Sequence, residues 1–188
     1  NTLVSAASPA VVHSLAGWSK LGTKKAFPML FCALGGGTEQ AENDSPSLFN
    51  LAECAQVVSL VKDLVDSLGP ADALKLSEIG VITPYFKQTA KLRQALRAAG
   101  LGQVKVGSTE EFHGLECRAL FISTVRTSAD GAATDEAFDM GLLCNPKRFN
   151  TAISRAASLV VVVGDKQALG HAAEWRAVIE LCEANDSV

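Results

Sequence analysis

The sequence has 15 glycines among its 188 residues but contains no phosphate-binding cradle of the form G-x-x-x-x-G-K-[ST]. The glycine run at 35–37 is followed by Thr38 and lacks the lysine that would contact nucleotide phosphates. The acidic pair at 135–136 is similar to a magnesium-binding motif, but no apolar strand precedes it, and we interpret it as solvated loop. We therefore expect that the chain alone neither binds nor hydrolyses ATP productively.

Cysteine pairs at metal-ligand spacing are also missing. The five cysteines are scattered, odd in number and without a C-x-x-C pair, which argues against a disulfide framework and a zinc site. This usage suits a reducing compartment, so we expect a cytoplasmic protein with no metal ligands of its own. No apolar run approaches membrane-spanning length, and the first residues do not form a signal-peptide pattern, so no membrane partner is expected.

The composition is that of a globular domain, with 48% hydrophobic and 20% charged residues. A formal net charge of −3 excludes binding of nucleic acid by bulk positive charge but leaves room for a local basic groove. Residues 1–26 are rich in Ala and Ser, and we expect an irregular lead-in with a short helix near 9–17. We expect one domain over 27–188.

Strand and helix patterns alternate along this domain. The run LVVVV at 159–163 has no polar alternation and is typical of a strand covered on both faces. Asn50 with Glu53, and Ser108 with Glu111, have the spacing of capping boxes, whereas 35–47 is expected to be loop. The pattern predicts an α/β fold with a mainly parallel sheet between helices. The expected strands are 27–34, 79–82, 104–106, 119–125 and 159–163, and the expected helices are 50–68, one carrying 92–99, 145–156 and 172–184.

Ligands of such folds bind beyond the carboxyl ends of the strands. This rule places 83–85, 107–109, 126–127 and 164–165 on one rim. Arg148 and Arg155 lie about two turns apart in the helix at 145–156, so both guanidinium groups could address one anion. We expect Arg155 to face this rim, while a structural salt bridge is as good an interpretation of Arg148.

Four segments, in order, are similar to the motifs of one family. ITPYFKQ (82–88), VGSTEEFHGLE (106–116), FISTVR (121–126) and NPKRFNTAISRA (145–156) resemble motif IV, motif V, the strand after it and motif VI of superfamily 1 helicases of the nonsense-mediated-decay type. SPSLFNLAE (45–53) resembles the RNA-silencing, Armitage-like members. The resemblance implies a RecA-like α/β/α domain, the second motor lobe.

From this resemblance we expect the C-terminal lobe of an ATP-dependent helicase that moves 5′ to 3′ on single-stranded RNA. ATP and Mg²⁺ would be held mainly by a first RecA-like lobe of the same polypeptide, and RNA-silencing or RNA-decay proteins would be further partners. The resemblance makes Arg155 the arginine finger, with Arg148 second, and assigns nucleotide contacts to Gly114 and Glu116. Glu116 could instead be a strand-start carboxylate paired with Arg118.

Hydroxyl and backbone N–H groups at helix starts can bind phosphates without reading sequence. Ser108 could do so or act as a plain N-cap, and Tyr85 could stack on a base or pack in the domain. His113 stands where relatives usually have Gln. The residues expected to contact nucleic acid are Thr83, Pro84, Tyr85, Ser108, Thr109 and His113.

Two other functions fit the same residues. One is a non-catalytic lobe kept as a scaffold that binds nucleic acid or protein, with His113 as a sign of decay. The other is the lobe of a DNA helicase of the same superfamily, because none of the residues singled out reads a 2′-hydroxyl.

Overall fold

The structure is a computed structural model, and it describes residues 8–22, 27–35, 38–43, 45–68, 74–128 and 142–188. Its centre is a five-stranded sheet in the order β1-β7-β6-β4-β5, and every pairing in it is parallel. All its carboxyl ends therefore meet at one edge. The strands are β1 (Met29–Ala33), β4 (Ile79–Ile82), β5 (Lys105–Gly107), β6 (Cys117–Ser123) and β7 (Ala156–Gly164).

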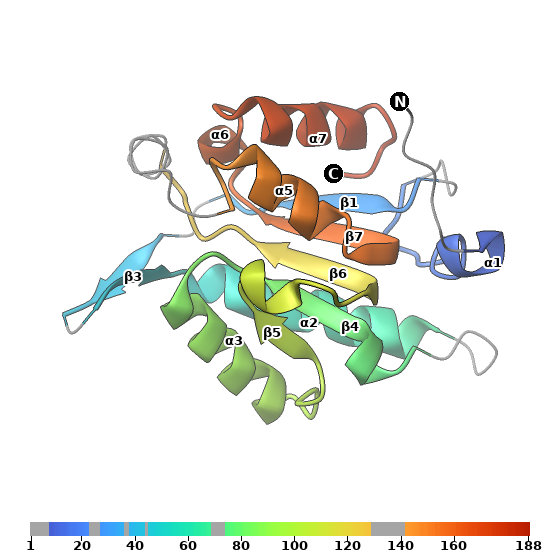
Figure 1. Cartoon of the computed structure of the whole chain (residues 1–188), viewed down its shortest axis with the longest axis horizontal. Helices are drawn as coiled ribbons and strands as arrows, with labels where there is room; N and C mark the ends of the chain where they lie inside the picture. Colours follow the sequence, from blue (N-terminus) through green and yellow to red (C-terminus); the bar gives the residue numbers. More distant parts are fainter. Residues whose placement is uncertain (1–7, 23–26, 36–37, 44, 69–73, 129–141) are drawn as a thin grey trace.

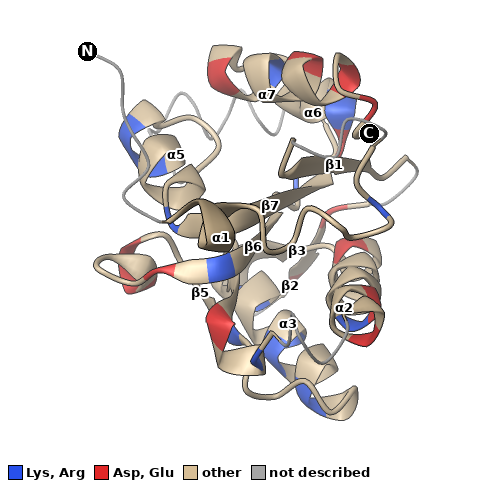
Figure 2. Ribbon diagram, turned by 90° about the vertical axis from the view of Figure 1, so that its right-hand side faces the viewer, with Lys and Arg blue, Asp and Glu red and all other residues tan. Residues whose placement is uncertain are grey.

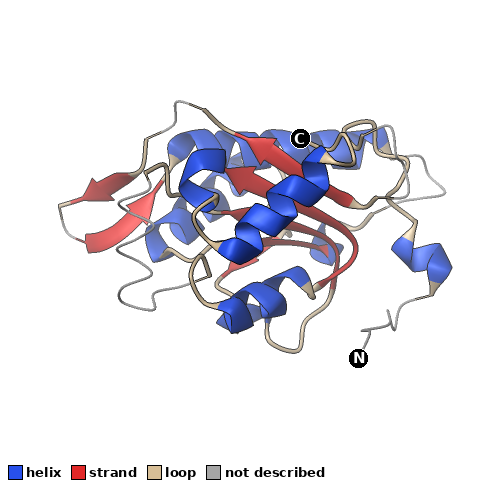
Figure 3. Ribbon diagram, turned by 90° about the horizontal axis from the view of Figure 1, so that it is seen from above, coloured by secondary structure: helices blue, strands red, loops and turns tan. Residues whose placement is uncertain are grey.

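Helices cover both faces of this sheet (Figures 1 and 3). One face carries α2 (Leu51–Ser67) and α3 (Phe86–Ala98), and the other carries α5 (Pro146–Ile153) and α7 (Ala173–Glu183). The predicted RecA-like three-layer arrangement is thus confirmed. The short helices are α1 (Pro9–Val12), α6 (Lys166–Leu169) and the 3-10 turns η2 (Leu76–Glu78) and η3 (Glu110–Phe112).

The sheet separates two apolar clusters, one under each helix layer. Val61 and Leu64 of α2 pack with Leu92 of α3 on one face. Trp175 and Ile179 of α7 pack on the other. The strands are apolar on both sides because each side is covered, which is why the sequence shows continuous runs rather than alternation.

A β-hairpin occupies part of the stretch that we expected to be loop. Its strands are β2 (Gln40–Glu42) and β3 (Ser45–Phe49), which pair antiparallel and project from the body (Figure 1). Glu42 holds it to α3, with its carboxylate 2.5 Å from Lys87 and 2.7 Å from Lys91. The hydrogen bonds from Lys87 and Lys91, with the charges of these two lysines, lower the pKa of Glu42 to about 2, and no local pattern in the sequence reveals this long-range pairing.

The helix that we predicted over 145–156 is shorter, because α5 ends at Ile153 and Ser154 is its C-cap. The next strand, β7, starts at Ala156 rather than Leu159, where Ala156 lies opposite Cys117 of β6. Arg155 therefore stands between helix and strand, not in the last turn of the helix.

Several predictions lie outside the described residues. They concern residues 1–7 of the expected lead-in, the glycines at 36–37 and the acidic pair at 135–136. Within the described part of the lead-in, Trp18 is buried and its indole N–H donates to Asp63 of α2 at 2.8 Å.

A buried polar network joins the start of α2 to the end of β6. Asn50 caps α2 as predicted, accepting from the backbone N–H groups of Ala52 and Glu53. The Glu53 carboxylate, however, does not complete a capping box. It accepts from the Ser123 hydroxyl at 2.6 Å and from the Val125 backbone N–H at 2.9 Å.

Burial dominates the electrostatics of this carboxyl group. Desolvation raises the pKa of Glu53 to about 7, although the hydrogen bonds from Ser123 and Val125 oppose the shift. The same bonds hold Val125 at a φ of 71°, which a β-branched residue rarely adopts. The network thus fixes the turn that follows β6.

We predict that Glu53→Gln removes a pH dependence of folding stability. The pKa of Glu53 is about 7 in the folded protein and 4.5 ordinarily, so between these values the folded state keeps a proton that the unfolded chain has lost. The free energy of unfolding therefore falls as pH rises through this window, by on the order of 3 kcal/mol. Denaturant titrations across the window measure the change.

Glu42→Gln is the control. Because the pKa of Glu42 is lowered to about 2, its contribution is lost only as pH falls from about 4.5 toward 2. This variant should keep the wild-type slope across the Glu53 window. A Glu53→Gln protein with that same slope would contradict the prediction.

Candidate functional site

The carboxyl ends of β4, β5 and β6 form a rim of polar residues at 83–85, 107–109 and 124–127, which we call the carboxyl rim. The Thr83 backbone N–H donates to the Gly107 carbonyl at 3.1 Å, so the ends of β4 and β5 stay together. The Ser108 hydroxyl accepts from the Glu111 backbone N–H at 3.4 Å, but Thr109 rather than Ser108 is the N-cap of η3, so the predicted capping box is wrong. The rim thus brings together the predicted residues Thr83, Ser108 and Thr109.

Exposure differs among the rim residues. The side chains of Thr83 and Thr109 are buried, whereas those of Pro84, Tyr85 and Ser108 are half-buried. A phosphate contact through the Thr83 hydroxyl would require this side chain to become exposed. A contact through the exposed edge of the rim requires no such change.

Tyr85 is held in place by Arg126. The Arg126 Nε–H donates to the Tyr85 hydroxyl at 2.8 Å, and the guanidinium carbon lies 5.6 Å from the ring centre. Arg126 is itself buried and pairs with Glu39 at 2.9 Å. The packing interpretation of Tyr85 therefore describes the structure, and its base contact stays a prediction.

A second surface runs along η3 and α5, on the opposite face of the sheet from α3. We call the residues Glu110, Leu115, Glu116, Arg148 and Arg155 the η3–α5 surface. Arg148 Nε lies 2.8 Å from Glu110 Oε1, and Arg155 donates from Nη1 to the Leu115 carbonyl at 3.3 Å. The segments that resemble motif V and motif VI are thus in contact.

The expectation that Arg155 faces the carboxyl rim is wrong. Arg155 immediately precedes β7, and its carbonyl accepts from the Cys117 backbone N–H at the start of β6. Both positions are amino ends of parallel strands, opposite to the rim. The strand-end rule failed here because it describes residues that follow strands, whereas Arg155 precedes one.

The two arginines of the η3–α5 surface differ in how their charge is compensated. Arg148 is in an ion pair with Glu110, as the structural interpretation predicted. The Arg155 guanidinium donates only to neutral groups within the described residues, namely the carbonyls of Thr151 and Leu115 and the Ser154 hydroxyl. Its positive charge is therefore the one available to an added anion.

The pKa of Glu110 reflects its pairing with Arg148. Partial burial raises the pKa of Glu110, but hydrogen bonds from its backbone N–H and from Ser108, with the charge of Arg148, bring it below the usual value.

The other predicted residues of this region are exposed. Glu116, for which pairing with Arg118 was the alternative interpretation, is exposed, and Arg118 lies 3.6 Å from Glu78. His113 and Gly114 are exposed at the turn out of η3, where Gly114 has a φ of 74° that favours glycine.

Sequence analysis missed the residues that support the rim from below. Gln88 is buried, and its amide carbonyl accepts from the Asn50 backbone N–H at 2.8 Å while its amide N–H donates to Ser123 at 2.8 Å. The sequence signalled Gln88 only as the last residue of the segment that resembles motif IV, since its partners lie 38 and 35 residues away.

Within the described residues, no three His, Cys, Asp or Glu side chains are grouped to hold a metal ion. None of the described helices is long and apolar enough to cross a membrane.

We predict that Thr83→Val leaves the free energy of unfolding unchanged or raises it by up to about 1 kcal/mol. The Thr83 hydroxyl is fully buried and has no hydrogen-bond partner among the described residues. A buried unpaired hydroxyl is costly, and valine has nearly the same shape. Thermal and denaturant unfolding would measure the difference.

Ser123→Ala is the matched control, because its hydroxyl donates to Glu53 and accepts from Gln88. This variant should lose about 1–3 kcal/mol, since it leaves buried partners unsatisfied. A comparable loss in Thr83→Val would mean that the Thr83 hydroxyl is bonded in solution.

Comparison with known proteins identifies the family of this chain. A model of the family described as "AAA domain" matches residues 3–167. The human protein named RNA helicase Mov10l1 is 44% identical over 179 residues, which is 95% of this chain. The chicken protein named putative helicase MOV-10 is 38% identical over 88% of this chain, and the Drosophila melanogaster protein named probable RNA helicase armi is 36% identical over 80%.

The chain spans only a small part of each of these relatives. It covers 14% of the human protein, 18% of the chicken protein and 12% of the fly protein. The activity of a whole protein therefore depends on further sequence.

Proposed function

We propose that this chain is the C-terminal motor lobe of an ATP-dependent RNA helicase, because it belongs to the family described as "AAA domain" and has these RNA helicases among its relatives. In this role it would close on ATP and Mg²⁺ held mainly by a first RecA-like lobe of the same polypeptide. We further propose 5′ to 3′ movement, a cytoplasmic location and RNA-silencing or RNA-decay partners, all from the family resemblance.

The observation that carries the proposal is the η3–α5 surface. On it, Arg155 forms no ion pair with a described carboxylate, and its guanidinium donates to the carbonyl of Leu115, the residue before the exposed Glu116. A cation that meets the nucleotide only when two lobes close can stabilise the charge on a transferring phosphoryl group. Arg155 fits this task better than Arg148, because Arg148 would first have to leave Glu110.

The carboxyl rim supports the nucleic-acid part of the proposal. Ser108 lies at the start of η3, where its backbone and that of Thr109 can offer N–H groups to phosphates. The residues that follow, Glu110 to Leu115, lead along the η3–α5 surface to Arg155. The segment from Ser108 to Leu115 would therefore connect the bound RNA to the nucleotide.

The chain alone supplies no phosphate cradle, so we propose that the isolated lobe is inactive. The scaffold alternative would hold if the joined first lobe also lacked the cradle lysine. The sequence upstream of this domain decides between the two.

We predict that Arg155→Ala, made in the full-length polypeptide, lowers RNA-stimulated ATP hydrolysis by about 10³- to 10⁵-fold. Arg155→Lys should recover little, because a point charge does not replace the planar fork of guanidinium donors. Steady-state phosphate release measures both variants. Lys62→Ala, which removes an exposed charge from α2, should retain the wild-type rate.

RNA binding by an Arg155→Ala protein should be largely kept, which distinguishes the role of Arg155 in ATP hydrolysis from RNA binding at the carboxyl rim. ATPase activity at the wild-type level in this variant would exclude the finger role.

We also predict that a single-stranded RNA oligomer stimulates the full-length ATPase at lower concentration than the DNA oligomer of the same sequence. Half-saturating concentrations at one ionic strength are the measurement, because affinities depend strongly on salt. Stimulation by DNA at equal or lower concentration would favour the DNA-helicase alternative.

A further inference from the structure

The outer face of α3 is basic. The helix sequence, FKQTAKLRQALRA, has four basic residues and no acidic residue, in a chain whose formal net charge is −3. Figure 2 shows this concentration as blue segments without red along α3. The positive charge is therefore local to this helix and not a property of the whole chain.

The basic residues of α3 divide between two sides of the helix. Lys87 and Lys91 turn to the hairpin, where Glu42 compensates them. Phe86, Ala90, Arg93 and Arg97 are spaced at three and four residues and line the other side as one stripe. All four of these are exposed, and no ion pair of Arg97 occurs among the described residues.

Phe86 heads this stripe directly beside the carboxyl rim. It is 74% exposed and follows Tyr85, the N-cap of α3. A single exposed apolar residue needs no explanation. An aromatic ring at the end of a basic stripe is, however, the combination that binds single strands, by stacking a base and contacting phosphates.

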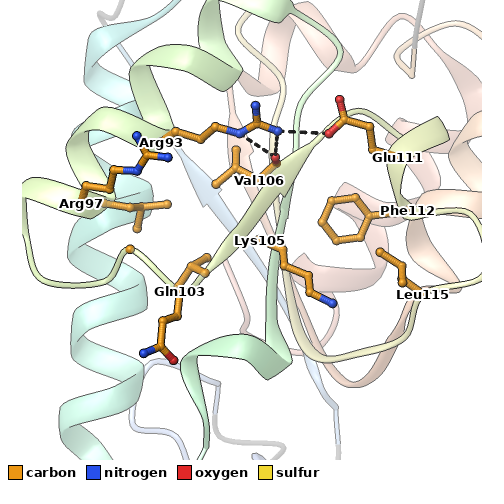
Figure 4. Close-up of a pocket in the computed structure, with 11 residues that line it drawn as sticks. Arg93, Arg97, Gln103, Lys105, Val106, Glu111, Phe112 and Leu115 are labelled. Atoms are coloured by element: carbon orange, nitrogen blue, oxygen red, sulfur yellow. Dashed lines mark hydrogen bonds and ion pairs between the residues drawn. The ribbon is translucent and has the colours of Figure 1, made fainter.

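The groove between α3 and β5 has a basic lining and an edge that a peptide strand could not pair with (Figure 4). It has a volume of about 390 Å³, and its lining includes Arg93, Arg97 and Lys105. β5 is an edge strand, so an added peptide strand would need its carbonyls. The Val106 carbonyl already accepts from Arg93 Nε at 3.0 Å and Nη2 at 2.5 Å, so this edge is blocked.

We propose that the outer face of α3 carries single-stranded RNA beyond the carboxyl rim, with a base stacked on Phe86 and a phosphate on Arg97, while Arg93 stays bound to Glu111 and Val106. This rests on the proposed function, because it extends the strand that the rim would hold. The stripe from Phe86 to Arg97 covers eleven residues of helix rise, about 16 Å. The contact therefore forms only when the strand is long enough to leave the rim and reach the stripe.

The test measures binding of fluorescein-labelled oligouridylates, about 6 and about 15 nucleotides long, to the 188-residue chain by fluorescence anisotropy. Phe86→Ala should weaken binding of the long oligomer about tenfold, as expected for one stacked base. Arg97→Ala should lower the salt slope of the long oligomer by about 0.7, the value for one phosphate contact on a single strand. Both variants should bind the short oligomer as the wild type does.

Two control variants remove the same chemistry elsewhere. Leu181→Ala deletes an exposed apolar side chain on α7, and Lys62→Ala deletes an exposed charge on α2. Neither should change binding of either oligomer. Phe86→Trp should restore the long-oligomer affinity, and a 2-aminopurine base in the long oligomer should be quenched by the wild type but not by Phe86→Ala.

The outcomes separate this inference from the proposed function. If both oligomers bind equally well to wild type, Phe86→Ala and Arg97→Ala, the stripe is overturned while the rim stands. If the wild type binds neither oligomer, the inference and the RNA-binding part of the proposed function fail together. Poly-glutamate is used as a competitor of the long oligomer. If it displaces the oligomer equally from the wild type and from Phe86→Ala, but not from Arg97→Ala, the face binds an acidic protein instead of RNA.

Discussion

The carboxylate of Glu53 is the interaction on which the carboxyl rim depends. It accepts from Ser123 at the end of β6 and from the Val125 backbone N–H two residues further along the chain. Together with a bond from Asn50 Nδ2 to the Val125 carbonyl at 3.3 Å, these bonds hold Val125 in a left-handed backbone conformation that is unfavourable for a β-branched residue. Since Arg126 follows directly and holds Tyr85, a buried acid at the start of α2 determines the geometry of the rim above it.

The same network explains why the hairpin and the rim form one unit. Glu39 pairs with Arg126 and accepts from the Thr127 backbone N–H, while Glu42 pairs with Lys87 and Lys91 of α3. These contacts join segments far apart in sequence through charge. The rim is therefore built on polar contacts, in contrast to the two apolar clusters beneath the helix layers.

Sequence reasoning was most successful where one local pattern sets the structure. The runs at 79–82 and 159–163 identified β4 and β7, and Asn50 and Asn145 identified the starts of α2 and α5. Each of these depends on neighbours in the chain or on burial of both faces.

It failed where a partner is distant. The hairpin at 40–49 depends on α3, and Glu53 looked like a capping residue because its partner Val125 is 72 residues away. The position of Arg155 was misjudged for a related reason: β7 begins three residues earlier than expected, with Ala156 opposite Cys117 of β6, and α5 ends at Ile153. The roles of these residues toward ligands are not determined by the fold, and they stay predictions.

The turn η3 has a mechanical consequence. Phe112 anchors it in the apolar cluster below, where the absence of a side chain at Gly80 leaves room for its ring. The segment that contains η3 runs from Ser108 to Leu115, so a ligand that displaces one end of this segment would strain or move the other. Thermodynamic reciprocity then requires that any change in affinity transmitted in one direction is returned by the same factor in the other. This anchored eight-residue segment would then couple the affinities of ligands bound at its two ends.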